Sequence, residues 1–224
     1  MQTNRISQHT RINNIFLGPL ERPALQWLAR RMPAWVTPDT CTVIGVAGAL
    51  LTAVSYGLSN LHPGFLWLAS LGFIVNWMGD SLDGTLARYR RIERPMYGYF
   101  VDHTVDLLAQ VMILIGLGSS PFVSFNIACL LLVSYLLMCG LVFLQTYVTG
   151  VFKLSYGGWG PTESRAVAIL LNTVMYFLGV QHLHFSDFAI CIYDVVVIAI
   201  ALVLFSFFLN TAAREIRRLA ALGK

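Results

Sequence analysis

Four aspartates stand out because their spacing suits metal chemistry. Asp80 and Asp83 are three residues apart, and Asp102 and Asp106 are four apart. Residues at these spacings lie on one face of an α-helix, so each pair would present two carboxylates together. The flanking residues are mostly apolar. Ionisable side chains inside membrane-spanning helices cost about 2.5–3.5 kcal/mol each on insertion scales and are by default functional, so the four aspartates form a candidate site.

The two pairs are expected to converge on one pocket. The first lies eight and five residues before Arg88, and the second lies four and eight residues after Gly98. On two antiparallel helices rising about 1.5 Å per residue, the carboxylates would reach matching depths. Such hard oxygen ligands suit two Mg²⁺ or Mn²⁺ ions, a known device for phosphoryl displacement. The alternative is a set of salt bridges to Arg88, Arg90, Arg91 and Arg94.

The composition places this site in a membrane protein. Hydrophobic residues fill 57% of the 224 positions and charged residues 12%, against roughly 25% charged residues in soluble domains. The mean hydropathy is +0.68. Crossing a bilayer core takes about 20 apolar residues. Six stretches approach that length and predict an all-α integral membrane protein with six transmembrane helices, at 39–58, 64–88, 98–118, 123–148, 164–181 and 186–211.

The distribution of basic residues indicates an orientation. Six spans would put both termini on one side, with the second-to-third and fourth-to-fifth connections. All fifteen lysines and arginines fall there: Arg5, Arg11, Arg22, Arg30, Arg31, Arg88, Arg90, Arg91, Arg94, Lys153, Arg165, Arg214, Arg217, Arg218 and Lys224. By the positive-inside rule that side is cytoplasmic. We therefore expect cytoplasmic termini and a cytoplasmic active site, in a multi-pass protein of a bacterial inner membrane.

Three regions follow from this organisation: an N-terminal cytoplasmic segment (1–38), a six-helix catalytic domain (39–212) and a basic tail (213–224). The first fourteen residues are polar, so no cleavable signal peptide is expected. The first region predicts an amphipathic helix on the membrane surface, with an apolar face of Leu20, Ala24, Trp27, Leu28 and Met32. A plain basic tail is the alternative. The four cysteines are scattered in apolar stretches and indicate core positions.

At the aspartates the sequence resembles the CDP-alcohol phosphotransferase family. Its signature is D-x-x-D-G-x-x-A-R, then eight or nine residues, then G-x-x-x-D-x-x-x-D. Every fixed position is filled here, with nine residues between the halves: Asp80, Asp83, Gly84, Ala87, Arg88, Gly98, Asp102 and Asp106. The resemblance implies an enzyme that moves a phosphate-linked group from a CDP-linked donor to an alcohol and releases CMP. It also implies two Mg²⁺ or Mn²⁺ ions and a homodimer.

The resemblance assigns roles to these residues. Asp80, Asp83 and Asp102 would hold the metals, and Asp106 would bind one of them and accept the proton of the incoming alcohol. The CDP site would be lined by the small and basic residues of the signature and by a segment that enters the first span: Gly84, Ala87, Arg88, Gly98, Thr37, Pro38, Asp39 and Thr42. Pro38 is also typical of a first helical turn, which is the structural alternative for that segment.

The acceptor must be recognised by residues outside the signature, and the candidates are Lys153, Glu163 and Arg165. The run Gly160–Glu163 resembles a stretch of the choline and ethanolamine phosphotransferase branch. Lys153 and Arg165 instead resemble the basic pocket by which other branches hold a phosphorylated acceptor. A helix start explains the same residues, with Pro161 in the first turn and Glu163 favourable near the helix dipole.

Three functions remain open. The leading one transfers a phosphatidyl group from CDP-diacylglycerol to a small polar alcohol. The second transfers a head group from CDP-choline or CDP-ethanolamine to diacylglycerol. A cation transporter is a remote alternative, because the aspartates cluster at one membrane face and not at the midplane, and no nucleic-acid partner is expected. Of the remaining polar residues, His103 is expected to face a neighbouring helix, and Asp194 has no evident partner.

Overall fold

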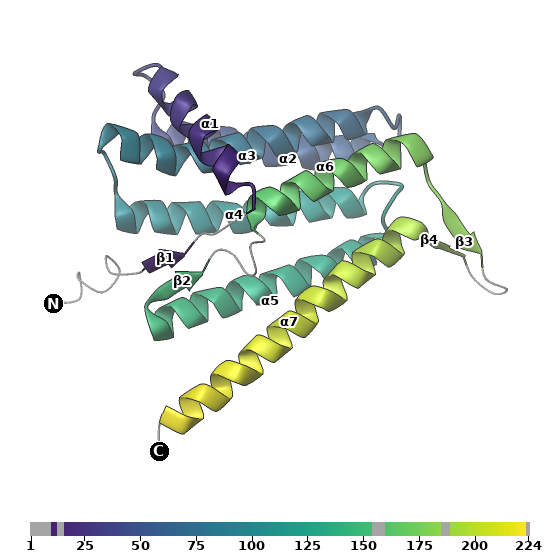
Figure 1. The fold of residues 1–224 in the computed structure, drawn as a ribbon. Helices are drawn as coiled ribbons and strands as arrows, with labels where there is room; N and C mark the ends of the chain where they lie inside the picture. The colour runs from purple at the N-terminus through teal and green to yellow at the C-terminus, as the bar shows by residue number, and fades with distance from the viewer. Residues whose placement is uncertain (1–9, 13–15, 154–159, 185–188, 223–224) are drawn as a thin grey trace.

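The computed structural model describes residues 10–12, 16–153, 160–184 and 189–222 (Figure 1). Within them the chain forms seven helices: α1 (Gly18–Arg31), α2 (Pro38–Leu58), α3 (Phe65–Arg90), α4 (Pro95–Gly118), α5 (Phe125–Thr149), α6 (Pro161–Leu178) and α7 (Ile192–Leu222). Two short strand pairs accompany them, parallel β1 (Thr10–Ile12) with β2 (Val151–Lys153) and antiparallel β3 (His182–His184) with β4 (Ala189–Cys191). The predicted all-α class is confirmed.

Five of the described helices are long and apolar enough to cross a membrane, namely α2, α3, α4, α5 and α7. They coincide with five of the six predicted spans. The remaining span corresponds to α6, which has 18 residues, begins with polar residues and is not among the five. The count of six therefore stays a prediction. In Figure 1, α6 lies beside α3, and α7 lies beside α5.

Close packing of α3 on α2 positions the first pair of aspartates. Gly48 of α2 and Gly79 of α3 lie at this contact, where a Cβ atom on either would overlap backbone atoms of the other helix. Across the same contact, Thr52 Oγ1 donates a hydrogen bond to the carbonyl of Ala69 at 3.2 Å. Small residues let membrane helices approach closely. The backbone around Asp80, the residue after Gly79, is therefore held firmly against α2.

Helix α1 packs against the ends of α2 and α3. It contributes two residues to a small buried core, which consists of Leu25, Ala29, Val36, Cys41, Leu82 and Leu86. At the end of α3, Arg90 donates hydrogen bonds to four carbonyls of the α1–α2 connection, those of Met32, Pro33, Ala34 and Val36. Leu20 and Trp27 remain exposed. The predicted helix therefore forms, while its contact with a membrane surface stays a prediction.

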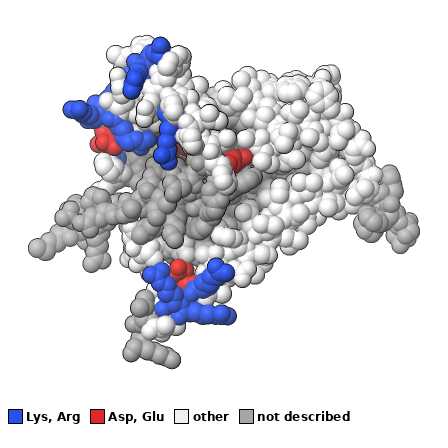
Figure 2. Space-filling model, in the orientation of Figure 1, with Lys and Arg blue, Asp and Glu red and all other residues white. Residues whose placement is uncertain are grey.

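Basic side chains gather at one end of the visible face. Figure 2 shows them over the end of the molecule that holds α1 and the C-terminal part of α7, whereas the surface toward the α2–α3 connection carries none on this face. Most of the remaining described surface is uncharged. This one-sided pattern agrees with the charge asymmetry expected from the sequence.

Candidate active site

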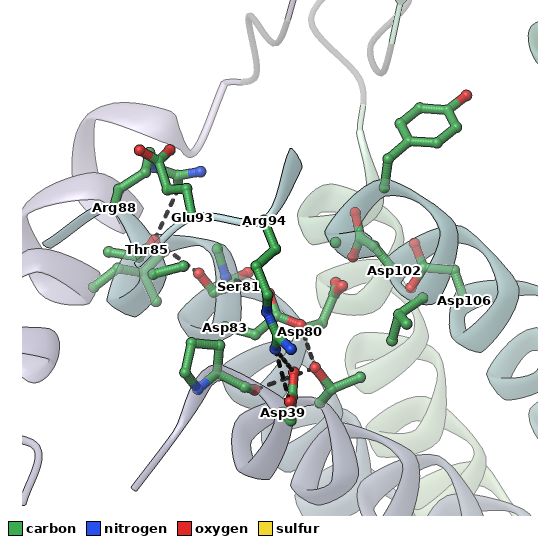
Figure 3. A pocket seen from close by; sticks show the side chains of 18 of the residues that line it. Asp39, Asp80, Ser81, Asp83, Thr85, Arg88, Glu93, Arg94, Asp102 and Asp106 are labelled. Atoms are coloured by element: carbon green, nitrogen blue, oxygen red, sulfur yellow. Dashed lines mark hydrogen bonds and ion pairs between the residues drawn. The ribbon is translucent and has the colours of Figure 1, made fainter. Parts of the chain in front are cut away.

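A cavity of about 790 Å³ lies where α1, α2, α3 and α4 meet the start of α6. Helices α3 and α4 both pack against α2, and the cavity opens between them. The chain reverses after α3 at Arg91, whose left-handed conformation (φ 57°) ends the helix. Four carboxylates from the two helices therefore line one cavity, those of Asp80, Asp83, Asp102 and Asp106 (Figure 3).

Three of these aspartates are close enough to share a ligand. Asp80, Asp102 and Asp106 each offer one carboxylate oxygen, and the three oxygens lie within 4.8 Å of one another. Three like charges at such separations repel one another. Carboxylate oxygens are also the ligands that Mg²⁺ and Mn²⁺ prefer. The donor set therefore fits a divalent cation by its chemistry and by its convergence.

Arg165 places a positive charge at the edge of this cluster. Its Nη2 donates to Asp80 Oδ2 at 2.8 Å, and its Nε donates to Asn76 Oδ1 at 2.9 Å. Asn76 Nδ2 in turn donates to the carbonyl of Gly45 at 3.0 Å. The Arg165 side chain is 15% exposed, so solvent screens this ion pair less than a surface pair. A continuous set of polar contacts therefore joins α6, α3 and α2 beside the cavity.

Arg90 and Arg94, near the α3–α4 connection, have partners outside the aspartate cluster. Arg94 Nη2 donates to both carboxylate oxygens of Asp39, at 2.6 and 2.7 Å, and these hydrogen bonds raise the pKa of Arg94 above its usual value. Arg90 binds the carbonyls that follow α1, and Arg88 Nη2 donates to Thr85 Oγ1 at 3.3 Å. The described contacts of Arg90 and Arg94 therefore give no support to salt bridges as the reason for the aspartate cluster.

Seven of the eight residues expected to hold CDP line the cavity: Pro38, Asp39, Thr42, Gly84, Ala87, Arg88 and Gly98. The eighth, Thr37, is the N-cap of α2 and is not among the lining residues; its Oγ1 accepts a backbone hydrogen bond at 3.2 Å. Asp83 faces this group, since its Oδ2 accepts from Thr42 Oγ1 at 2.8 Å. A Cβ on Gly98 would meet no atom within 4 Å. The glycine therefore leaves open space toward the cavity.

The three acceptor candidates lie in different environments. Arg165 lines the cavity. Glu163 is buried and is not among the lining residues: its Oε1 accepts from the Leu17 N–H and its Oε2 from the Gly160 N–H, both at 2.9 Å. Lys153 belongs to β2, and its side chain lies outside the described part of the chain. Glu163 therefore ties α1 to the start of α6, which favours the helix-start interpretation of this run.

Among the cavity residues that the sequence did not single out, Glu21 has the most distinctive contacts. Glu21 of α1 accepts hydrogen bonds from Ser81 Oγ at 3.2 Å and from Thr162 Oγ1 at 2.9 Å, and all three residues line the cavity. The signal in the sequence was weak, because an acidic residue in the first turn of a helix is already explained by the helix dipole.

Two other polar residues have structural partners. His103 packs toward α5, with its ring stacked 5.6 Å from that of Phe143, which confirms that it faces a neighbouring helix. Asp194 is buried at the start of α7. Its two carboxylate oxygens accept from the Ser124 N–H at 2.8 Å and from Ser124 Oγ at 2.7 Å. Asp194 therefore caps the start of α5 from the neighbouring helix.

Comparisons with known proteins point to one family. A family model described as CDP-alcohol phosphatidyltransferase matches residues 35–208. Cholinephosphotransferase 1 of Gallus gallus is 27% identical over 200 residues, which cover 80% of this chain and 55% of the relative. The Danio rerio protein of that name is 28% identical over 165 residues, 69% and 42% of the two chains.

A third relative matches a shorter part of the chain. Archaetidylinositol phosphate synthase of Methanothermobacter thermautotrophicus is 36% identical over 84 residues, which are 38% of this chain and 40% of that protein. The chain thus spans about half the length of the curated relatives that it matches.

Proposed function

Because the chain belongs to the CDP-alcohol phosphatidyltransferase family, we propose that it transfers a phosphate-linked group from a CDP-linked donor to an alcohol and releases CMP. The observation that carries this proposal is the convergence of Asp80, Asp102 and Asp106 in one large cavity. In the reaction, the acceptor oxygen forms a bond to the β-phosphorus of the donor, and the bond between that phosphorus and the oxygen of CMP breaks. The acceptor hydroxyl gives up one proton.

The four aspartates would hold two Mg²⁺ or Mn²⁺ ions, with Asp83 completing the set formed by the other three. When bound, such ions neutralise the charge that develops on the transferred phosphate. Around them, Gly98 leaves space for the phosphates to approach the backbone, and the end of the Arg88 side chain lies beside Gly84. Arg88 brings a guanidinium to the same cavity, and an arginine fork suits phosphate oxygens.

Asp106 is the proposed proton acceptor. It lies one turn deeper along α4 than Asp102, in the same cavity. A carboxylate within reach of the acceptor hydroxyl takes its proton as the oxygen attacks, which typically contributes about 10²–10⁴-fold in rate. Arg165 lies beside the cluster through its contact with Asp80 and helps to offset its negative charge. The remaining residues of the cavity bind and orient the two substrates.

The relatives favour a CDP-linked head group as the donor. The two that cover 69% and 80% of this chain are named cholinephosphotransferases. Arg165 is engaged with Asn76 and Asp80, so its described contacts do not favour a pocket for a phosphorylated acceptor. We therefore propose CDP-choline or CDP-ethanolamine as donor and diacylglycerol as acceptor. Transfer from CDP-diacylglycerol to a small polar alcohol is the second candidate, supported by the relative named archaetidylinositol phosphate synthase.

The test is CMP release by the purified protein in Mg²⁺ with each donor. We expect release from CDP-choline or CDP-ethanolamine that depends on added diacylglycerol. Release from CDP-diacylglycerol that depends on a small alcohol would select the second candidate. Failure to release CMP from any of these donors would overturn the transferase proposal, and metal-ion flux through vesicles would then support the transporter.

We also propose that α6 is a sixth span. Its 18 residues extend about 27 Å at 1.5 Å per residue, close to the roughly 30 Å of a bilayer core. Helix α1 and the end of α7 lie at the same end of the molecule (Figure 1), as an even number of spans requires. Reporters fused after Lys224 and within 91–94 are expected to be cytoplasmic; a reporter on the other side of the membrane would contradict the orientation.

The wider organisation belongs to the same proposal: regions 1–38, 39–212 and 213–224, with α1 on the membrane surface. We further propose a homodimer, as the family resemblance implies, in a bacterial inner membrane. Cross-linking in native membranes and membrane fractionation test these two points. A protein that stays monomeric at all concentrations would contradict the first.

A further inference from the structure

Glu21 is an acidic residue of the cavity that the aspartate chemistry does not use. Its two oxygens accept hydrogen bonds from Ser81 Oγ at 3.2 Å and Thr162 Oγ1 at 2.9 Å. A carboxylate offers about four lone-pair sites, so two hydroxyl donors leave acceptor capacity for a ligand. Among the ion pairs of the described residues, none includes Glu21. No basic side chain of the described residues therefore forms an ion pair with Glu21, although Arg22 and Arg165 line the same cavity.

The position of Glu21 is fixed by contacts on both sides along α1. Before it, the Leu17 N–H donates to the buried Glu163 at 2.9 Å. After it, Leu25 and Ala29 are buried in the small core with α2 and α3, and Arg90 binds the carbonyls that follow the helix. Glu21 could leave the cavity only if several of these contacts broke. Its carboxylate therefore belongs to the wall of the cavity.

Glu21 also contacts two residues that neighbour the aspartate cluster, where the transferred phosphate is proposed to bind. Ser81 directly follows Asp80 in α3, and Thr162 lies one turn before Arg165, which pairs with Asp80. The residues proposed for CDP come from α2 and from the facing ends of α3 and α4. Glu21 thus approaches the aspartate cluster from the α1–α6 side. A group linked to the β-phosphate and directed away from the nucleotide would extend toward this side.

We propose that Glu21 is a specificity-determining residue, whose carboxylate selects donors in which the alcohol carries a cationic amine. This inference rests on the proposed function, and it names the substrate class within it. A fixed carboxylate in a partly enclosed cavity attracts an ammonium group and does not distinguish a neutral alcohol in the same way. Ser81 and Thr162 orient the carboxylate through their hydroxyl groups.

The experiment compares two donors that share the nucleotide and differ in the charge of the alcohol. Equilibrium binding of CDP-choline and of CDP-glycerol is measured in Mg²⁺ for the wild type and for Glu21→Gln, which keeps the size of the side chain. We expect the substitution to weaken CDP-choline binding on the order of tenfold, the scale of one partly screened charge pair. CDP-glycerol binding should change less than about twofold. The matched control, Thr162→Val, removes one hydrogen bond but keeps the charge, so it should keep the preference for CDP-choline.

Two results would overturn the specificity role: an equal loss of affinity for CDP-choline and CDP-glycerol in Glu21→Gln, or unchanged CDP-choline affinity. Glu21 would then only connect α1 to α3 and α6 through hydrogen bonds. If that variant does not fold, the ionic-strength dependence of the wild type decides: CDP-choline binding must weaken with salt more than CDP-glycerol binding, and parallel curves would overturn the inference. Wild-type CMP release is measured separately. If the wild type releases CMP but Glu21→Gln keeps the wild-type preference for CDP-choline, only the role of Glu21 is refuted. If the wild type releases no CMP, the proposed function is refuted.

Discussion

Asp106→Asn should stabilise the metal-free protein while it strongly lowers turnover. Two unit charges 4.8 Å apart, the limit that holds among Asp80, Asp102 and Asp106, repel by about 3.5 kcal/mol at an effective dielectric constant of 20. Asp106 faces two such neighbours. Arg165 beside Asp80 and water in the cavity reduce the net effect, and we expect about 1–3 kcal/mol of stabilisation, which for a chain of this size corresponds to a rise in Tm of about 2–12 °C.

The assay is thermal unfolding of the purified protein in a chelator and in Mg²⁺. Metal that binds the folded state stabilises it by mass action, about 2.7 kcal/mol at 100 times Kd. Mg²⁺ should raise the Tm of the wild type more than that of Asp106→Asn, because the variant has lost a metal ligand. The difference between the two Tm values should therefore shrink or change sign. Asp194→Asn is the matched control. Asp194 also lies on a helix, but its carboxylate accepts two hydrogen bonds from Ser124. Asp194→Asn should therefore lower the free energy of unfolding by roughly 1 kcal/mol with or without metal.

A lower Tm for Asp106→Asn in chelator would refute this reasoning, because it would mean that internal hydrogen bonds hold the carboxylate more strongly than its neighbours repel it. A Tm difference that does not respond to Mg²⁺ would refute the assignment of Asp106 as a metal ligand. Either result leaves the proton-acceptor role to be judged by turnover alone.

Three further outcomes are expected. Chelation should abolish CMP release and Mg²⁺ or Mn²⁺ should restore it, measured as turnover before and after dialysis; undiminished turnover in chelator would exclude the two-metal mechanism. Asp106→Asn should lower kcat by about 10²–10⁴-fold and largely keep donor binding, whereas Arg88→Ala should mainly weaken donor binding. Loss of donor binding in Asp106→Asn would contradict the role of Asp106 as the base. Gly79→Ala should lower stability by about 1–3 kcal/mol through overpacking against α2, while Gly57→Ala, where a Cβ meets no atom within 4 Å, should be neutral or stabilising.

The aspartate cluster could be predicted because its geometry is local. Spacings of three and four residues place two carboxylates on one helix face whatever the rest of the chain does, and a short connection brings the two faces together. The structure accordingly gathers Asp80, Asp102 and Asp106. The membrane helices were predictable for a similar reason, since length and hydropathy are properties of a continuous segment. Helix α6 was harder, because its polar start lowers the apolar signal while its partners lie on α3.

The remaining residues depend on partners that are far away in the sequence. Glu163 accepts a hydrogen bond from Leu17, 146 positions earlier, and Asp194 accepts one from Ser124, 70 positions before it. No periodicity links such positions. A buried carboxylate that satisfies backbone N–H groups therefore looks in the sequence like one that binds a substrate. Glu163 was an acceptor candidate because the run Gly160–Glu163 resembles one branch of the family, and that role stays a prediction. Glu21 was not singled out, since an acidic residue in the first turn of a helix is already explained by the helix dipole.

Local contacts within neighbouring helices and contacts between distant parts of the sequence hold different parts of the site, and this difference bears on substrate choice. The carboxylates of the reaction lie on α3 and α4, and α3 is fixed by backbone packing on α2 that tolerates no added Cβ at Gly79. The contacts between α1 and the start of α6 are instead made by single side chains, Glu163 and Glu21, while α1 packs on α2 and α3 through the small core. A substitution of Glu21 or Thr162 on that wall changes its charge or shape and leaves the packing of α3 on α2 in place. Variation in the alcohol that is transferred should therefore map to α1 and α6, while the phosphate chemistry stays with α3 and α4.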